Sequence, residues 1–438
     1  MSVACFLSPS IRNSSYNSAR RRPSTFIGGF TLMPNPYPKL RATLDIRPVE
    51  QNGKRLLLLR DPAQISDAML GIPQALAPVL LLCDGQWDAE SIAIICAEQF
   101  HIRFEDGVLE GMIEALDEAL FLDNARFAQA KQRALDEYRA APFRPPMLAG
   151  ASYPENPDEL RQRLEGYLAE AGDVTPTPAQ ARGLVSPHID YMRGHAVYAK
   201  VWKRAAESVK AADLIIMLGT DHYSDEAGSL TLTRQHYATP YGILPTARGI
   251  VDKLADAIGP EDAYRGELRH RGEHSLELVA VWLHHLRAGK PVEMVPILTG
   301  SFGHFVKEGA SPLTDPKMRA LLDMLKRETQ GRRALVVASG DLAHVGPAFE
   351  GDPLDVAAKA TLAAEDDGVI KRMCVGDADS FYWVVQRLGN RNNVCGLSPV
   401  YLTLKLLGNA EGERVAYAMC PADEQNTSAV TVCGVVLE

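Results

Sequence analysis

Short, unbroken apolar runs alternate with helical patterns through the last 260 or so residues of the chain. The apolar runs are residues 182–185, 214–218, 294–298, 334–338 and 429–437, and the helical patterns are residues 194–209, 250–258, 276–286, 316–328 and 399–407. Strands that are buried on both faces of a parallel sheet have this composition. The pattern predicts one α/β domain over residues 146–438, with a mostly parallel sheet flanked by helices.

Residues 45–125 have a different pattern and predict a second, smaller domain. An apolar run at residues 55–60 precedes helical patterns at 73–83, 89–99 and 106–120, and residues 120–122 suit a closing strand or wing. This order predicts a small winged-helix-like domain. The stretch LLLCDGQWDAESIAIICAEQF is similar to part of the PqqD-like peptide-recognition domains, although a plain helical docking domain fits equally well. A charged helix and the helix-breaking stretch PFRPPM predict a linker over residues 126–145.

The first 44 residues contain six basic side chains and no acidic one, and we expect them to form a disordered head. The head suits either a transit peptide or a start codon assigned too early, with Met33 as the true start, and we favour the second. No apolar run is long enough to span a membrane. Seven cysteines without a CxxC pair predict a reducing cytoplasm, and a net charge of −9 gives no reason to expect nucleic acid binding.

Three of the predicted strands lead directly into possible ligands or catalytic groups. LVSPH ends on His188, LIIMLGTDH ends on His222, and ALVVASGDLAH contains Asp341 and His344. Ligands of open α/β sheets bind beyond the carboxyl ends of the strands. One such histidine alone is more often an ordinary loop residue, but the shared placement of all three predicts a site.

Two further segments carry candidate site residues. Cys395 precedes a predicted helix start at Ser398 and Pro399, and the positive end of a helix favours the thiolate that a metal ligand or nucleophile requires. His274 begins another predicted helix, where Glu273 and Glu277 suit a charged surface. We expect the remaining cysteines to be packing residues. We expect five other histidines to be exposed to solvent: His101, His236, His270, His284 and His285.

Seven motifs over about 290 residues resemble the Memo family in type and order. They are MLAGASYPENPDELRQRLEGYLAEAG, SPHIDY, LGTDHY, TPYG, EHSLE, SGDLAH and VCGLSP. With its N-terminal extension, the chain is similar to the AmmeMemoRadiSam system protein B group. The resemblance implies a fold like that of the class III extradiol dioxygenases (LigB-like), and it implies radical SAM and AMMECR-like partner proteins.

The same resemblance implies that His188, His222 and Cys395 are metal ligands, and that Asp341, His344 and His274 complete the site as catalytic residues. A thiolate favours copper or zinc, while Asp341 as the third ligand would restore an iron site of two histidines and a carboxylate. Asp190 suits either a turn residue or a hydrogen-bond partner of His188.

The chain is therefore expected to be a metal-dependent redox enzyme, dioxygenase-like and using non-haem iron or copper, whose N-terminal domain binds a peptide. The alternative is a non-catalytic metal carrier or scaffold. A zinc or thiolate hydrolase that uses Cys395 ranks lowest, because no nucleophile-elbow motif is present.

Overall fold

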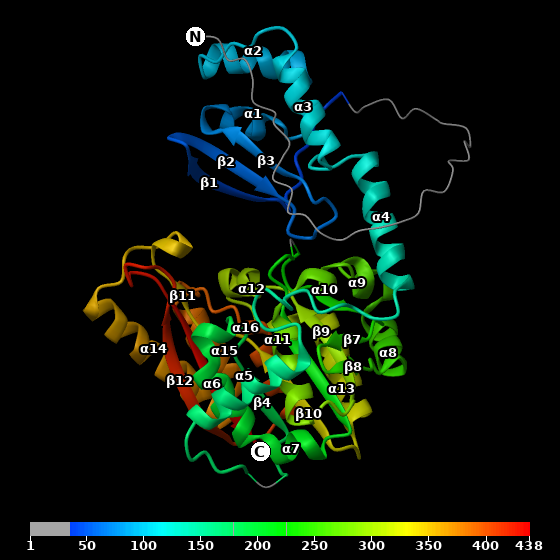
Figure 1. Cartoon of the computed structure of the whole chain (residues 1–438), viewed down its shortest axis with the longest axis vertical. Helices are drawn as coiled ribbons and strands as arrows, with labels where there is room; N and C mark the ends of the chain where they lie inside the picture. The colour runs from blue at the N-terminus through cyan, green and yellow to red at the C-terminus, as the bar shows by residue number, and fades with distance from the viewer. Residues whose placement is uncertain (1–35, 178, 225) are drawn as a thin grey trace. The chain divides into compact units, whose positions relative to one another are not determined.

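The computed structural model describes residues 36–438 apart from residues 178 and 225, and the chain divides into two compact units (Figure 1). The first unit is Met1–Arg133 and the second is Ala134–Glu438. Helix α4 (Ala125–Ala140) runs along the chain across this boundary. Most of the expected disordered head, residues 1–35, lies outside the described residues.

The first unit combines a three-stranded antiparallel sheet with three helices. The strands β1 (Asp45–Gln51), β2 (Lys54–Arg60) and β3 (Met69–Pro73) lie in that order, followed by α1 (Ala77–Leu82), α2 (Ala89–Gln99) and α3 (Val108–Glu118). The expectation of one strand before the helices was wrong. Asn52 and Gly53 both have positive φ and form the two-residue turn between β1 and β2, and the dipeptide Asn-Gly is a strong hairpin signal in the sequence. The winged-helix-like arrangement stays a prediction.

Residues 39–41, which we had assigned to the disordered head, belong to this unit. The backbone N–H of Leu40 donates to Cys83, and Leu40 and Leu122 form an isolated β-bridge. Arg41 is buried and forms a two-pronged ion pair with Asp61. Backbone pairing and a buried ion pair order this segment, and a composition without acidic residues gave no indication of either.

The second unit contains an eight-stranded mixed sheet. Its strand order is β11 (His344–Val345), β13 (Ala429–Leu437), β4 (Gly183–Ser186), β10 (Ala334–Ser339), β5 (Leu214–Thr220), β9 (Glu293–Thr299) and β6 (Leu230–Leu232), and β12 (Gly412–Pro421) also pairs with β13. All five predicted strands are present. Strands β4, β10, β5 and β9 are mutually parallel, whereas β6, β11, β12 and β13 pair antiparallel. The sheet is therefore mixed, not mostly parallel. A short connection joins β12 to β13, and such connections produce antiparallel pairs.

Both faces of the sheet are covered because residues of the central strands alternate between two cores. In β5, Leu214, Ile216 and Leu218 join one core, while Ile215 and Met217 join the other. The first core contains side chains from α8 (Arg248–Ile258), α9 (Pro260–Arg265), α12 (Gly303–Glu308), α13 (Pro316–Thr329), α14 (Val356–Val375), α15 (Ala378–Arg387) and α16 (Leu397–Leu407). The second contains side chains from α5 (Pro157–Glu170), α6 (Tyr191–Arg204), α7 (Ala206–Ala211) and α11 (Ser275–Leu286). The predicted helix at residues 194–209 is thus two helices.

Three smaller elements complete the second unit. Strands β7 (Tyr237–Thr239) and β8 (Gly242–Leu244) form a hairpin, and α10 (Arg269–Gly272) precedes α11. Over residues 36–438, apart from the two gaps, no helix combines the length and apolar character needed to cross a membrane.

Candidate metal centre

The candidate site lies at the carboxyl edge of three adjacent parallel strands. Ser186 at the end of β4 pairs with Ser339 at the end of β10, and Ser339 also pairs with Gly219 in β5. The residues that follow these strands include His188, Asp341 and His222. Short loops after neighbouring strands of equal register bring these side chains to one place, as expected for an open α/β sheet.

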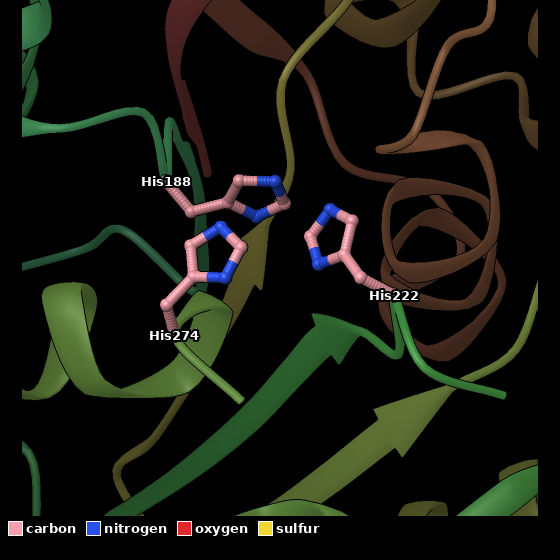
Figure 2. Close-up of side chains that lie close together, drawn as sticks. All are labelled: His188, His222 and His274. Atoms are coloured by element: carbon pink, nitrogen blue, oxygen red, sulfur yellow. The ribbon is translucent and has the colours of Figure 1, made fainter. Parts of the chain in front are cut away.

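Three imidazole rings face one another at this edge (Figure 2). The ring centroids of His188 and His222 are 4.9 Å apart, those of His188 and His274 are 5.3 Å apart, and those of His222 and His274 are 4.7 Å apart. His188 is buried, whereas the side chains of His222 and His274 are 28% and 33% exposed. The cluster therefore has a protein side at His188 and a side that solvent or a small molecule reaches.

A buried carboxylate, Glu273, holds two of these rings. Its Oε1 atom lies 3.1 Å from Nδ1 of His222 and 3.1 Å from Nδ1 of His274, and it also accepts the backbone N–H of Ser275 at 2.9 Å. Its Oε2 atom accepts the backbone N–H of His222 at 2.9 Å. A carboxylate can only accept here, so both Nδ1 atoms carry protons and each ring has its Nε2 atom available as a ligand.

The orientation of His188 follows from a different chain of hydrogen bonds. Ser339 uses its hydroxyl proton to donate to the carbonyl of Ser275 at 2.6 Å. Its Oγ atom, 3.4 Å from Nδ1 of His188, is therefore the acceptor, and Nδ1 of His188 carries the proton. His188 thus also offers Nε2 to the site.

A second group of potential ligands shares His188. The Sγ atom of Cys395 lies 3.2 Å from Nε2 of His188, and an Oδ2 atom of Asp341 lies 3.8 Å from the same nitrogen. The other oxygen of Asp341 accepts the backbone N–H groups of His188 and Ile189 at 2.8 and 3.3 Å. Asp341 therefore fixes the His188 loop as well as facing the site.

Two glycines allow the Cys395 and Asp341 loops to meet. A Cβ atom at Gly340 would lie 2.4 Å from the Cα atom of Gly396, and one at Gly396 would lie 2.7 Å from the carbonyl oxygen of Asp341. Side chains at either position would force the loops apart. Close contact between the two loops therefore explains why glycine occupies position 340 of SGDLAH and position 396 of VCGLSP.

His344 lies at the margin of the cluster. Its Nδ1 atom donates to the carbonyl of Asn393 at 3.2 Å, which leaves Nε2 as the acceptor. His344 is near enough to Asp341 and His222 for their charges to affect its pKa, although burial is the largest influence and lowers it. It belongs to neither of the two groups of potential metal ligands found among the described residues.

The pKa shifts describe the charge of the metal-free site. Burial lowers the pKa of His188 well below its usual value, and burial raises the pKa of the Cys395 thiol. Burial also opposes charge on His222, but the Glu273 carboxylate outweighs it and raises the pKa of His222 well above its usual value. The reverse holds for Glu273, where burial raises the pKa but His222 lowers it to well below its usual value. At neutral pH, His222 and Cys395 consequently carry protons that a metal ion must displace.

The donor atoms fit a metal ion. The ligand atoms of His188, His222 and His274 lie within 4.8 Å of one another, and so do those of His188, Asp341 and Cys395. A metal about 2 Å from each nitrogen keeps its ligands within about 4 Å of one another, so side-chain movements of less than about 1 Å close either set. Nitrogen, sulfur and carboxylate donors together suit iron, copper or zinc.

Several expectations about individual residues change in the structure. Helix α16 begins at Leu397 after Gly396, two residues earlier than expected, and Ser398 hydrogen-bonds to Thr299 instead of capping the helix. Burial outweighs the nearby helix end and disfavours the Cys395 thiolate. Asp190 is the N-cap of α6 and accepts from the backbone of Arg193, so it is a turn residue.

Of the five histidines outside the motifs that were expected to be exposed, only His101 is exposed; His236 is half-buried and the other three are buried. His270, His284 and His285 are buried. His270 bonds to the Tyr237 hydroxyl and the Thr231 carbonyl, and His284 bonds to the Thr239 hydroxyl and the Gly289 carbonyl. Tertiary hydrogen-bond partners make this burial possible, and they are distant in sequence.

Glu273 and Glu277 were also wrongly assigned to the surface, since both are buried. The available signal was their presence in the EHSLE motif beside His274, where a carboxylate next to a histidine is a common orienting partner.

Comparisons with known proteins identify the family of the chain. The family profile described as Memo-like protein matches residues 144–436, and the chain belongs to the Memo family. A protein of Aquifex aeolicus described as a MEMO1 family protein is 26% identical over 385 residues, covering 87% of this chain and 94% of the relative. A Thermus thermophilus MEMO1 family protein is 28% identical over 320 residues, covering 71% of this chain and 87% of the relative.

The lengths of these matches show that some relatives match both units and others match little more than the second. The match to the Aquifex aeolicus protein is longer than the second unit, so the similarity extends into the first. A Methanopyrus kandleri MEMO1 family protein, 27% identical, matches over only 284 residues, which is 63% of this chain but 91% of that relative. That relative has little room for an additional N-terminal unit.

Proposed function

We propose that the second unit binds one redox-active metal ion, iron(II) or copper, and acts as a metal-dependent redox enzyme. The observation that carries this proposal is the pair of contacts from buried Glu273 to Nδ1 of His222 and His274. A buried carboxylate that orients two histidines is typical of metal centres, because it fixes the tautomer and increases the basicity of the ligand nitrogen.

The proposed ligands are His188, His222 and Cys395, with Asp341 as an additional or alternative ligand. The proposed set draws on both groups of donor atoms, since His222 belongs to the group with His274, Cys395 belongs to the group with Asp341, and His188 is common to both. The Cys395 thiolate favours copper and zinc, and the Asp341 carboxylate favours iron. Binding zinc would leave a site without redox chemistry, so the native metal decides between a redox centre and a Lewis acid.

The proposed catalytic residues are His274, His344 and Asp341. Their role is proton transfer to or from a substrate, while the bound metal would supply a redox-active centre with an exchangeable coordination position. His274 is partly exposed, with Nδ1 held by Glu273 and Nε2 as the acceptor. His344 likewise donates through Nδ1 to Asn393, which leaves Nε2 to accept a proton.

A non-catalytic metal carrier or scaffold is the second candidate function. Partial exposure of His222 and His274 suits metal transfer as well as turnover, because a partner protein can reach an exposed ligand. The two functions differ in dioxygen use: a carrier loads and releases metal, whereas the enzyme consumes dioxygen in the presence of a reductant.

The proposal includes a cytoplasmic location, radical SAM and AMMECR-like partner proteins, and a peptide ligand for a PqqD-like first unit. The support is the sequence resemblance together with the extended match to the Aquifex aeolicus relative. Binding of candidate partners to the full chain would test this part independently of the metal.

The decisive experiment measures metal bound to the full chain after loading with iron(II) or copper(I) without oxygen. We expect one metal ion per chain in the wild type and little in His188→Ala, His222→Ala or Cys395→Ser. His195→Ala and Cys374→Ser are the matched controls, because His195 contacts Glu170 and Cys374 lies on α14, neither in the candidate site. Equal metal retention in site and control variants would contradict the proposal.

A further inference from the structure

A buried ion pair next to the candidate metal centre has no place in the chemistry described so far. Arg144 is fully buried and donates to the carboxylate of Glu277. The same guanidinium donates to the carbonyls of His270 at 2.8 Å, Glu273 at 3.0 Å and Pro145 at 3.0 Å. Arg144 therefore fixes the backbone at both ends of the segment from His270 to Glu273.

Glu277 also has several hydrogen-bond partners. Besides Arg144, its carboxylate accepts the Tyr153 hydroxyl and the backbone N–H groups of Met147 and Leu148 at 2.9 and 2.8 Å. These contacts connect residues 144–153, the segment that follows α4, to the first turn of α11. The AGASY and EHSLE motifs, far apart in sequence, meet at this one carboxylate.

The segment that Arg144 fixes also contains the residues that bind the His222 loop. Arg269 donates to Asp221 at 2.7 Å, and Glu273, four residues later, binds both the main chain and the ring of His222. Glu277, four residues later again, binds residues 144–153 through the contacts above. The stretch from residue 269 to residue 277 is thus fixed at one end to the His222 loop and at the other to residues 144–153.

We propose that Arg144 and Glu277 are positioning residues of the metal centre, which set the place of Glu273 and hence the orientation of His222 and His274. This inference rests on the proposed metal binding. Its physical basis is that a buried ion pair is seldom the most stabilising choice at such a position, since apolar residues of similar volume often do as well or better. What apolar residues cannot replace is the set of donors to the His270 and Glu273 carbonyls.

The test compares variants that separate stability from positioning, with cobalt(II) as the probe of affinity and of coordination geometry by its visible absorption. The double variant Arg144→Met/Glu277→Met removes both charges together, so it leaves no unpaired buried charge, and its stability is measured beside its cobalt(II) affinity. Arg144→Lys keeps the charge but loses the planar fork that serves several acceptors. We expect both variants to bind cobalt(II) about tenfold more weakly, with an altered spectrum.

A second buried ion pair provides the matched control. Arg41→Met/Asp61→Met replaces a similarly buried pair that belongs to the first unit, whereas the candidate site belongs to the second. We expect this variant to keep the wild-type cobalt(II) affinity and spectrum. If Arg144→Met/Glu277→Met folds and binds cobalt(II) with the wild-type affinity and spectrum, the pair does not position the metal centre and the inference is overturned.

A metal-free measurement keeps this inference distinct from the proposed function. In selectively labelled metal-free chain, imidazole nitrogen NMR reports the Nδ1 protons of His222 and His274 directly. We expect Arg144→Lys to shift the resonances of His222 and His274 but not of His195. A wild type that binds none of iron(II), copper(I) and cobalt(II) would overturn the proposed function, whereas unchanged His222 and His274 resonances in Arg144→Lys would overturn the positioning role.

Discussion

The Glu273 carboxylate binds His222 twice, through the ring at Nδ1 and through the backbone N–H. One buried side chain therefore determines both where the His222 loop lies and which ring nitrogen faces the site. Glu273 lies in the turn before α11, not at the end of a strand. The metal centre therefore depends on a segment outside the edge formed by β4, β10 and β5.

Glu273→Gln should weaken metal binding about 10- to 100-fold while the protein stays folded. Glutamine has one acceptor oxygen and a donor amide, so it cannot accept from both Nδ1 atoms and from the His222 backbone at once. Titration with iron(II) or cobalt(II) measures the effect. Glu267→Gln is the control, because Glu267 is also buried but binds Arg139 and Thr233. Equal affinities in the two variants would refute the orienting role.

Metal affinity should rise with pH through the neutral range. The pKa values of His222 and Cys395 are both raised, so both groups are protonated there in the metal-free protein and each must lose a proton on binding. Affinity then increases by about tenfold per pH unit for each proton displaced. His188 contributes no proton, because its pKa is lowered.

Calorimetric titration in buffers of different ionisation enthalpy counts the released protons. Cys395→Ser should release one proton fewer than the wild type, provided that the remaining ligands still bind the metal. An affinity that does not change between about pH 6 and pH 8 would contradict this assignment of protonation states.

Asp341→Asn should stabilise the metal-free protein and weaken metal binding. Burial raises the pKa of Asp341 above its unfolded value, so the native state binds more protons and the stability falls as pH rises between these two pKa values. The penalty is present above the folded-state pKa, and asparagine removes it while its oxygen can still accept from His188 and Ile189. We expect a gain on the order of 1 kcal/mol by chemical denaturation.

The prediction has opposite signs for the metal-free and the metal-bound protein. Metal should raise the melting temperature of the wild type more than that of Asp341→Asn, because the charged ligand is lost. A variant that is less stable than the wild type without metal would show that the carboxylate charge is satisfied by the protein alone.

Gly340→Ala should destabilise the protein by about 1–3 kcal/mol and reduce metal binding. Its Cβ atom would lie 2.4 Å from the Cα atom of Gly396 and would push the Cys395 loop away from Asp341. Gly368→Ala is the control, because a Cβ atom there meets nothing within 4 Å and helix α14 should gain about 0.5–1 kcal/mol. Denaturation and metal titration of both variants check the prediction, and a Gly340→Ala protein that binds metal normally would contradict it.

The sequence by itself determined the α/β class, five strands of the second unit (β4, β5, β9, β10 and β13) and the segments that carry the site. Unbroken apolar runs such as LIIML arise because a strand inside a two-sided sheet faces apolar layers on both sides, so the signal is local and strong. Motifs at the ends of these runs identified His188, His222, Asp341 and Cys395 because loops after parallel strands collect at one edge.

Only the tertiary structure decided which partners these residues have. Strand β12 contains the apolar run VAYAMC, which was not predicted as a strand, and most of its side chains are only partly buried. The antiparallel direction of its pairing with β13 is a property of the assembled sheet. The sequence predicted a surface position for four polar residues that are buried: Glu273, Glu277, His270 and His284. A polar side chain is buried only where other groups satisfy its hydrogen bonds, and those groups are distant in sequence. The sequence shows which atoms can bind a metal, but only their packing decides which nitrogen of each ring faces the site and which charges surround it.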